Sequence, residues 1–385
     1  MTDFDKESFE LHERFGGKLE IVSKVPLKDR ADLSRAYTPG VAAVSSAIAG
    51  DPGLMYKYTP KGRMVAIVSD GSAVLGLGNV GAAAAYPVME GKCLLFKQFA
   101  GIDAFPIVVR TQDTSEIVSL VENICEGFGG INLEDISAPR CFEIEAALKE
   151  RLDIPVFHDD QHGTAIVALA GLTNALKVVE KDKDVRIVIN GAGSAGIAIC
   201  KLLHAAGFNN IVVLDTRGAI YEGRSENMND YKVEISRFTN PEKLRGSLEE
   251  VLKGADVFIG VSQPGLVSKE MVRNMAEKAI VFALANPTPE IMPDEASEAG
   301  AAVVASGRSD SKNQLNNVLV FPGIFRGALS ARISKLDQNI FLAAAEALAA
   351  LVPNPNMEKI IPNPFEEGIA DAISKAVISA HEREI

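Results

Sequence analysis

The stretch Val185-Arg-Ile-Val-Ile-Asn-Gly-Ala-Gly-Ser-Ala-Gly196 decides the fold of this chain. It joins a short apolar run to the pattern Gly-x-Gly-x-x-Gly, and a helical pattern over residues 196–206 and a second apolar run, Ile211–Asp215, follow it. A strand, a glycine turn, a helix and a parallel strand form the first unit of a doubly wound, Rossmann-type nucleotide-binding sheet. Further strands, alternating with helices, are expected at residues 257–261, 280–283 and 302–306.

The glycine turn predicts how a dinucleotide binds. Gly191 permits the tight turn, Gly193 lets the pyrophosphate approach the backbone, and Gly196 allows close contact between helix and strand. The phosphate is expected at the helix N-terminus, beside Ser194 and Ala195. The alternative is a purely structural glycine turn.

Asp215 is the predicted reader of the cofactor's ribose. It ends the next strand, 24 residues after Gly191. A carboxylate there accepts hydrogen bonds from the ribose hydroxyls and repels a 2′-phosphate, which favours NAD over NADP. Arg217, two residues further, could still receive a phosphate, so use of NADP stays open. The alternative is an ordinary acidic loop residue.

Short apolar runs in the first part of the chain also indicate parallel strands. We therefore expect an α/β protein of two domains, since 385 residues exceed one ordinary domain. Residues 1–160 would form an N-terminal α/β substrate and metal domain, with a loop-rich start over residues 1–60. Residues 161–385 would form the Rossmann domain with C-terminal helices near residues 324–334, 338–351 and 365–383. The runs of the first domain lie at residues 64–70, 93–96, 105–109, 130–134 and 154–157.

Four carboxylates flank one predicted strand, helix and strand. Glu134 and Asp135 follow the first of these strands, and Asp159 and Asp160 follow the second. The carboxyl ends of parallel strands share one edge of a sheet, so the side chains should converge, and like charges held that close need a cation. Such oxygen ligands suit Mg²⁺ or Mn²⁺. The alternative is that Asp135 and Asp160 only cap the helices that follow them.

The composition is that of a soluble globular protein, with 47% hydrophobic and 23% charged residues. The net charge of −12 argues against nucleic acid or an anionic membrane as a partner, and an anionic substrate would need a local cation. The four cysteines form no CxxC pair, so neither a zinc site nor a disulfide framework is indicated. The N-terminus has no pattern of a secretory signal, and no apolar run is expected to span a membrane, so a cytoplasmic location is expected.

A tyrosine and a lysine are candidates for proton transfer. Tyr37 lies in a short turn before a helix, in the stretch Ser34–Val41, and Lys92 is expected between a helix and a strand. The two can exchange protons if a nearby metal and burial lower the pKa of the lysine. The alternative is a packed tyrosine and a solvated lysine.

A series of motifs resembles the malic enzymes in their short bacterial and archaeal form. The motifs follow in order over roughly residues 34–323 and so cover most of the chain. They are Tyr37-Thr-Pro-Gly40, Ser69-Asp-Gly-Ser72, Leu75-Gly-Leu-Gly-Asn-Val-Gly81, Glu90-Gly-Lys92, Leu133-Glu-Asp135, Phe157-His-Asp-Asp-Gln-His-Gly-Thr164, Ala285-Asn-Pro-Thr288 and Asn316-Asn-Val-Leu-Val-Phe-Pro-Gly323.

The resemblance implies oxidative decarboxylation of L-malate to pyruvate and CO₂, with NAD(P)⁺ as hydride acceptor, a divalent metal as Lewis acid, and a homodimer. It assigns Lys92 as the base for the C2 hydroxyl, Tyr37 as the acid that protonates the enolate, and Asp159 as the group that adjusts the lysine. The implied metal ligands are Glu134, Asp135 and Asp160. The residues implied to hold the substrate carboxylate and the nicotinamide side are Asn286, Asn316 and Asn317.

One position departs from the family pattern, and other readings stay open. Larger malic enzymes carry an arginine for a substrate carboxylate where this chain has Ala73-Val74. The alternative activities are the malolactic reaction, in which NAD stays bound and lactate leaves, a decarboxylating dehydrogenase for another hydroxyacid, and a non-catalytic NAD sensor. We also hypothesise that the N-terminal segment with Tyr37 packs across a partner subunit and completes its active site.

Overall fold

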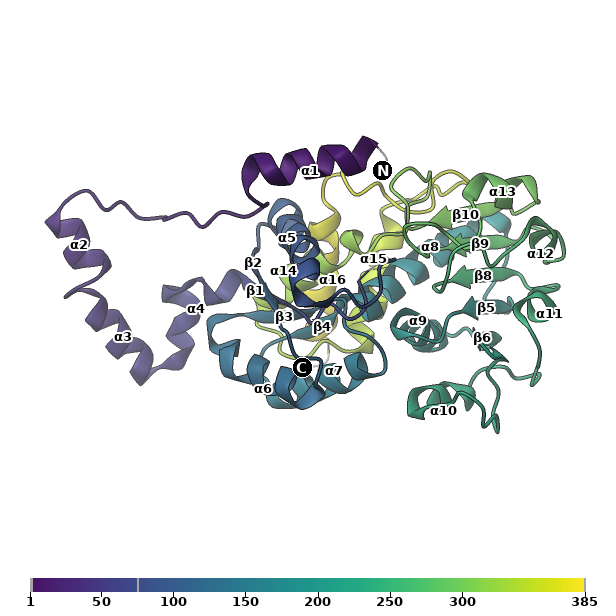
Figure 1. Cartoon of the computed structure of the whole chain (residues 1–385), viewed down its shortest axis with the longest axis horizontal. Helices are drawn as coiled ribbons and strands as arrows, with labels where there is room; N and C mark the ends of the chain where they lie inside the picture. Colours follow the sequence, from purple (N-terminus) through teal and green to yellow (C-terminus); the bar gives the residue numbers. More distant parts are fainter. Residues whose placement is uncertain (1–2, 75, 384–385) are drawn as a thin grey trace.

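The computed structural model describes residues 3–74 and 76–383. Two mainly parallel β-sheets lie one beyond the other along the longest axis, each with helices packed on it (Figure 1). The prediction of an α/β protein built on two sheets is confirmed, and so is the doubly wound plan of the second sheet.

The first sheet has the strand order β2-β1-β3-β4, and all its pairs are parallel. Its strands are β1 (Met64–Ser69), β2 (Asp103–Val108), β3 (Gly130–Leu133) and β4 (Val156–His158). The helices between them are α5 (Gly81–Ala100), α6 (Thr114–Ile124), the single turn η3 (Cys125–Gly127) and α7 (Arg140–Arg151). The side chains of β1, β3 and β4 are almost all buried on both faces, as expected for a parallel sheet covered by helices, whereas the edge strand β2 is only partly buried.

The predicted strand at residues 93–96 is wrong, because these residues lie inside the long helix α5. Met89, Cys93 and Phe96 are buried at helical spacing, so the apolar run is one face of a helix. Lys92 therefore lies on this buried face rather than in a loop before a strand.

The second sheet has the order β10-β9-β8-β5-β6-β7, with only the short β7 antiparallel to its neighbour. Its strands are β5 (Ile187–Asn190), β6 (Ile211–Asp215), β7 (Gly218–Ala219), β8 (Val257–Gly260), β9 (Ile280–Ala283) and β10 (Val303–Ser306). Its helices are α9 (Ser194–Ala205), α10 (Asp230–Ser236), α11 (Leu248–Leu252), α12 (Lys269–Arg273) and α13 (Pro293–Glu298). The strands predicted near residues 257, 280 and 302 are confirmed.

The chain passes between the two sheets twice. The first passage is the π-helical turn η4 (Asp159–Gly163) with the buried helix α8 (Thr164–Val179). The second leads from β10 through η5 (Asn317–Leu319) into α14 (Phe321–Ala331), which packs on α5 through ring contacts of Phe321 and Phe325 with Phe96. The predicted C-terminal helices are confirmed as α14, α15 (Gln338–Ala350) and α16 (Ile369–Glu382). The domain boundary at residue 160 stays a prediction.

One segment is long and apolar enough to span a membrane, contrary to the expectation from the sequence. This segment, Asp159–Val179, is the π-helical turn together with α8, and 72% of its most apolar window is buried inside the protein. The helix packs against α9 and α15, so it is a core element of the fold.

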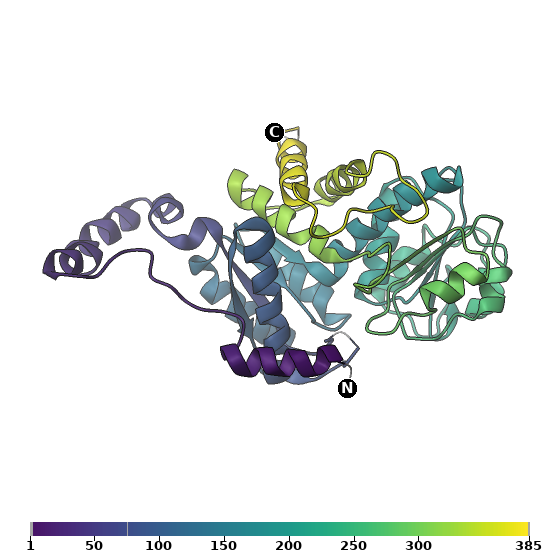
Figure 2. The same ribbon diagram turned by 90° about the horizontal axis from the view of Figure 1, so that it is seen from above.

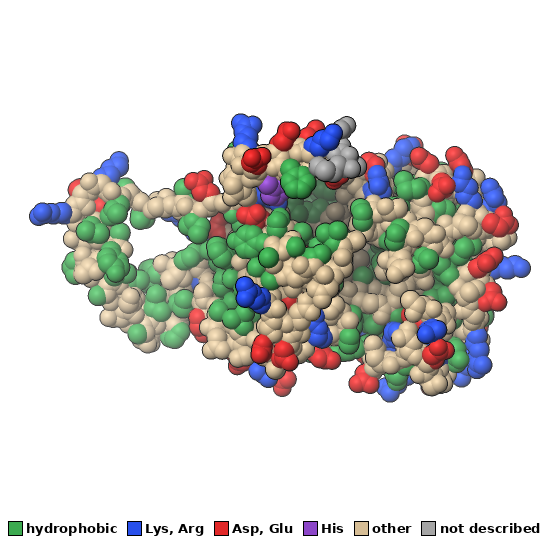
Figure 3. Space-filling view, viewed as in Figure 1, with side chains coloured by type: hydrophobic (Ala, Val, Ile, Leu, Met, Phe, Trp, Pro, Cys, Tyr) green, Lys and Arg blue, Asp and Glu red, His purple; other side chains and the backbone are tan. Residues whose placement is uncertain are grey.

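The N-terminal segment is more helical than predicted. Helix α1 (Asp3–Phe15) crosses α5 near one end of that helix, whereas the next helices project away from the body (Figures 1 and 2). We call the projecting segment, residues 30–58, the arm. It contains α2 (Arg30–Ala36), α3 (Val41–Gly50), η1 (Pro52–Leu54) and α4 (Met55–Tyr58), and the turn η2 (Pro60–Arg63) joins it to β1. Neither α2 nor α3 buries a single residue, and apolar side chains are visible along the arm in Figure 3.

Candidate active site

Three carboxylates meet where β3 and β4 end. The two strands are paired in register, with Leu133 opposite His158, so the residues after each strand emerge at the same edge of the sheet. One oxygen from each of Glu134, Asp135 and Asp160 lies within 4.8 Å of the others. The convergence expected from the sequence is present, and these are the residues that could hold a metal ion.

Neither Asp135 nor Asp160 caps a helix, so this alternative is wrong. The N-cap of α7 is Pro139, and that of α8 is Gly163, and neither makes a side-chain capping bond. Asp135 has a positive φ of 54°, and its backbone N–H donates to Asp160 Oδ2 over 2.8 Å. The two residues are therefore tied to each other rather than to a helix end.

Lys92 is the positive side chain that contacts the cluster among the described residues, and it offsets only part of the charge of the three acids. Burial raises the pKa of Asp135 to about 9, and the charges of Asp160 and Glu134 add to this shift. Burial likewise raises the pKa of Glu134 to about 7 and that of Asp160 to about 6. Asp135 Oδ2 is buried and has no hydrogen-bond partner within the described part of the chain. An all-oxygen set with an unpartnered carboxylate fits a hard cation such as Mg²⁺ or Mn²⁺.

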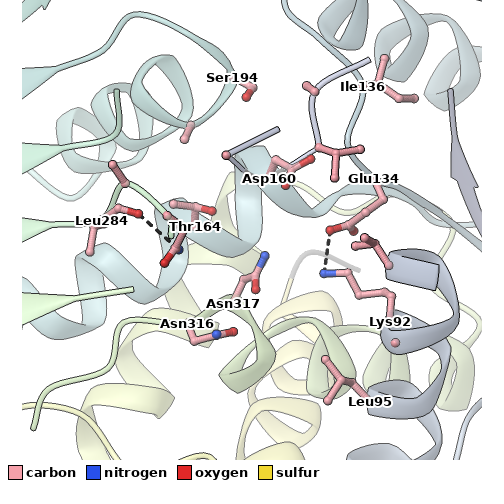
Figure 4. A pocket seen from close by; sticks show the side chains of 18 of the residues that line it. Lys92, Leu95, Glu134, Ile136, Asp160, Thr164, Ser194, Leu284, Asn316 and Asn317 are labelled. Atoms are coloured by element: carbon pink, nitrogen blue, oxygen red, sulfur yellow. Dashed lines mark hydrogen bonds and ion pairs between the residues drawn. The ribbon is translucent and has the colours of Figure 1, made fainter. Parts of the chain in front are cut away.

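Lys92 reaches this cluster from the buried face of α5 (Figure 4). Its Nζ donates to Glu134 Oε1 over 2.8 Å and to Asp159 Oδ2, and it lies 4.2 Å from the centre of the Phe321 ring. Burial disfavours the ammonium ion, but the charges of Asp159 and Glu134 outweigh it and raise the pKa of Lys92. The lysine is therefore a buried cation between two acids, and the reading of a solvated lysine is wrong.

Asp159 connects the two passages of the chain. It is fully buried, and its Oδ2 accepts hydrogen bonds from both Lys92 and Asn317 Nδ2. Burial raises the pKa of Asp159 to about 7, although Lys92 opposes the shift. A Cβ at Gly163 would collide with Asp159, so a glycine is required one turn further along the π-helix.

The three predicted asparagines lie at one cavity but have different contacts. Asn317 donates to Asp159, as described. Asn316 Oδ1 accepts from the backbone N–H of Val318 over 2.9 Å and so caps η5. Asn286 makes a 3.4 Å contact with the Leu284 carbonyl, and its side chain lines the cavity. Their roles toward substrate and cofactor stay predictions.

A cavity of about 1000 Å³ joins the carboxylate cluster to the second sheet. Figure 4 shows Ser194 at the top, Asp160 below it, Glu134 and Lys92 at the right, and Asn316 and Asn317 below the centre. Because one space holds both the acidic cluster and the glycine turn, a substrate on the acids would face a dinucleotide on the turn.

The glycine turn has the geometry that its pattern predicts. Gly191 has a φ of 122°, and a Cβ there would lie 2.6 Å from the Val261 carbonyl oxygen. A Cβ at Gly196 would collide with the carbonyl oxygen of Gly191, whereas one at Gly193 would meet no atom within 4 Å among the described residues. The backbone is thus crowded toward the sheet and open toward the cavity, at the N-terminus of α9.

Asp215 is not the free anion that the sequence suggests. Its Oδ2 accepts from Arg224 (2.5 Å), Lys232 (2.7 Å) and Asn227 (3.0 Å), and its side chain is only 6% exposed. These hydrogen bonds hold the pKa of Asp215 below its usual value, although burial opposes them. Two cations already balance the carboxylate, so the argument that it repels a 2′-phosphate loses its force. The partners lie in a polar stretch whose sequence carries no signal for this pairing.

Comparison with known proteins agrees with this geometry. Family models described as the malic enzyme N-terminal domain and the malic enzyme NAD-binding domain match residues 16–149 and 161–380. The chain belongs to the malic enzyme family. It is 55% identical to the bifunctional malic/malolactic enzyme of Bacillus subtilis, over 97% of this chain and 92% of the relative. It is also 55% identical to the NAD-dependent malic enzyme of Geobacillus stearothermophilus, over 99% and 79% of the two chains.

Solved malic enzymes share the whole architecture. The NAD-dependent malic enzyme of Thermotoga maritima superimposes with a TM-score of 0.94 at 50% identity, over 96% of this chain and 98% of the other. The malic enzyme of Pyrococcus horikoshii gives 0.95 at 46% identity, over 99% and 92%. The NADP-dependent malic enzyme of Rhizobium meliloti is 50% identical, and 50% of its length is matched.

Tyr37, which the malic enzyme resemblance assigns as the acid, does not reach the cavity of its own chain. It follows α2 in the arm, and its side chain is 67% exposed. The alternative of a packed tyrosine is therefore wrong within one chain. This arm projects from the body, so Tyr37 and Lys92 do not meet within one chain, and the packing of the arm across a partner subunit stays a prediction.

Sequence reasoning missed two cations near the malic enzyme motifs. Arg140, in the first turn of α7, donates to Asp70, Ser72 and the Gln112 carbonyl and is fully engaged. Lys18 lines the catalytic cavity together with His12 of α1. A single lysine in a polar N-terminal segment carries no sequence signal, so only the contacts of Lys18 with Pro87 and Glu90 of α5 could reveal it.

Proposed function

We propose that this protein catalyses the oxidative decarboxylation of L-malate to pyruvate and CO₂ with reduction of NAD(P)⁺. The observation that carries the proposal is one cavity lined by Glu134, Asp160 and Lys92 of the acidic site and by Ser194 and Ala195 of the glycine turn. A hydroxyacid whose C2 oxygen lies at the carboxylates would place its C2 hydrogen toward the nicotinamide side.

For the metal, we propose Mg²⁺ or Mn²⁺ held by Glu134, Asp135 and Asp160. The unpartnered Asp135 Oδ2 and the raised pKa values of the three acids support a cation among them. Such an ion supplies Lewis acidity at the substrate's C2 oxygen when bound.

Lys92 acts as the base for the C2 hydroxyl in this proposal. Base action requires the neutral amine, whereas the charges of Asp159 and Glu134 raise the pKa of Lys92. A divalent cation among the three acids would oppose this effect by repulsion, and Asp159 Oδ2, which accepts from Nζ, is placed to receive the lysine proton. Asn317 Nδ2 donates to the same Asp159 oxygen, so it helps to hold this carboxylate in position beside Lys92.

We further propose that NAD is preferred and that NADP is also used. Two relatives named NAD-dependent, at 55% and 50% identity, support the preference. Relatives named NADP-dependent reach 50% identity, and the balanced charge of Asp215 leaves Arg217, 62% exposed, for a phosphate.

We propose a homodimer in which Tyr37 of one subunit serves the cavity of the other. The exposed apolar arm supports this, because helices that bury nothing in their own chain gain stability only against another surface. We also propose a cytoplasmic location, which suits four free cysteines of which three are buried.

The deciding experiment follows absorbance at the NADH band with malate, Mn²⁺ and either NAD⁺ or NADP⁺, with pyruvate measured in parallel. Equal yields of pyruvate and reduced cofactor support the proposal, and no reduction with either cofactor would contradict it. A second candidate is the malolactic reaction, because one relative at 55% identity is named as bifunctional. Lactate formed from malate without net NADH would identify it.

A further inference from the structure

The cavity of this malic enzyme lacks the expected cation for the far carboxylate of its substrate. Ala73 and Val74 line the wall where larger relatives carry an arginine. Arg140 cannot replace it, because its guanidinium is held by Asp70, Ser72 and Ser137. Lys92 is balanced by two acids. A dianionic substrate therefore needs another positive group.

Lys18 is held at the cavity by the turn that follows α1. Gly16 and Gly17 have φ values of 66° and 108°, which reverse the chain toward α5. A Cβ at Gly17 would lie 2.6 Å from Glu90 Oε1, and the same oxygen accepts from the Lys18 backbone N–H over 3.3 Å. Glu90 is buried on α5, two residues before Lys92. The contact therefore holds Lys18 against the helix that carries the base.

The ammonium of Lys18 has one proton left for a ligand. Its Nζ donates to the Pro87 carbonyl over 2.9 Å and to His12 Nε2 over 2.6 Å. His12 Nδ1 contacts the Ser8 carbonyl over 2.7 Å, so Nδ1 carries the proton and Nε2 accepts. The described residues provide no acceptor for the third proton, which is free to meet a substrate in the cavity that Lys18 lines. Burial lowers the pKa of Lys18, and Glu90 opposes this.

Lys18 and Lys92 line the same cavity, and both are held on α5, Lys18 through the Pro87 carbonyl and Lys92 as a residue of the helix. Lys92 marks the carboxylate cluster, where the C1 carboxylate and C2 oxygen would bind. Lys18 is therefore a second cation in the same space, available to the other carboxylate of a diacid.

We propose that Lys18 binds the C4 carboxylate of malate and so takes the place of the missing arginine. The proposal rests on the proposed function. In the decarboxylation the C3–C4 bond breaks, its electron pair stays on C3, and the carboxylate leaves as neutral CO₂. An ammonium ion on this carboxylate stabilises the bound substrate more than the transition state, so it contributes to KM rather than to kcat.

The test compares Lys18→Met and Lys18→Gln with the wild-type holoenzyme, and uses Lys6→Met, an exposed lysine of the same helix α1, as the control. Loss of a hydrogen bond to a charged group should raise the KM for malate about 10-fold to 100-fold, with kcat not lowered. Inhibition by oxalate, which resembles only the metal-chelating half of the substrate, should stay within about twofold. Lys18→Arg should recover part of the affinity.

The outcomes separate this inference from the proposed function. An unchanged KM in both variants, a lower kcat at unchanged KM, or equal weakening of malate and oxalate would overturn the role of Lys18. If Lys18→Met fails to fold by circular dichroism, Lys18→Gln decides, since it keeps a polar group of similar reach. Failure of the wild-type enzyme to make pyruvate from malate would instead contradict the proposed function.

Discussion

The carboxylate cluster and the arm differ in burial and in the number of contacts that hold their side chains. Asp159, Glu134 and Lys92 are nearly or fully buried, and each is bonded to at least two neighbours. Tyr37, which the family resemblance places in the same reaction, stands exposed on helices that bury nothing. The acids and the lysine are thus brought together within a single chain, whereas Tyr37 would reach them only in the proposed dimer. Each prediction below tests one side of this difference.

The largest effect is expected at the buried side. Lys92→Ala should lower kcat for malate oxidation about 10³-fold to 10⁴-fold, because it removes the base and leaves Asp159 without its cation. Lys97→Ala, on the same helix but 61% exposed, is the matched control and should keep near-normal activity. Small primary amines that fill the vacated space should restore part of the rate. Normal turnover in Lys92→Ala would remove the lysine from the mechanism.

The arm is tested by mixing two inactive variants. If Tyr37 serves the partner's cavity, an equal mixture of Tyr37→Phe and Lys92→Ala subunits should recover about one quarter of wild-type activity, since half the dimers are mixed and each has one intact site. The measurement requires subunit exchange verified by mass spectrometry. Mixed dimers without activity would show that Tyr37 does not act across subunits.

The metal ligands are tested by a change in charge at nearly constant shape. Asp160→Asn should raise the metal concentration for half-maximal activity by about 10-fold to 100-fold, because a neutral amide replaces an anionic ligand. Asp153→Asn, an exposed aspartate just before β4, should leave the metal dependence unchanged. A normal metal requirement in Asp160→Asn would argue that this residue is not a ligand.

The smallest effect is expected at Asp215, far from the chemistry. Asp215→Asn should lower the melting temperature by about 2 to 4 °C at neutral pH, because Arg224 and Lys232 lose their shared anion. The folded-state pKa of Asp215 lies below the unfolded value, so its stabilisation is present above about pH 4 and is lost as the pH falls further. The melting temperature of the variant should therefore fall less steeply than that of wild type over this acid range. If the melting temperatures of the variant and of the wild type fall equally steeply as the pH decreases, Asp215 is not stabilised by Arg224 and Lys232.

The sequence predicts best where local pattern and site coincide. The glycine turn, the strands around it and the convergence of Glu134, Asp135 and Asp160 follow from strand ends that meet at one edge of a sheet. Prediction from the sequence fails where the structure depends on a longer stretch of chain or on contacts between distant residues. The run from Cys93 to Phe96 is apolar enough for a strand, and only the length of α5 shows that it is one helix face.

Long-range pairing explains the remaining misses. Lys232, which neutralises Asp215, lies 17 residues away in a polar segment. Lys18 is held at the cavity by Pro87, a residue of α5 that lies 69 positions further along the chain. Neither contact has a periodicity or a motif, so the tertiary structure alone shows them.

The hydrogen bond between Asp159 and Asn317 has a consequence for motion. These residues stand at the two passages of the chain between the sheets, 158 positions apart, and share one carboxylate oxygen with Lys92. A rotation of the nucleotide-binding sheet relative to the first sheet that preserved these hydrogen bonds would leave Asp159 in contact with Lys92. The base and the acids would then keep their spacing while the cofactor approaches or withdraws, so the molecule could open to exchange ligands without dismantling its proton-transfer path.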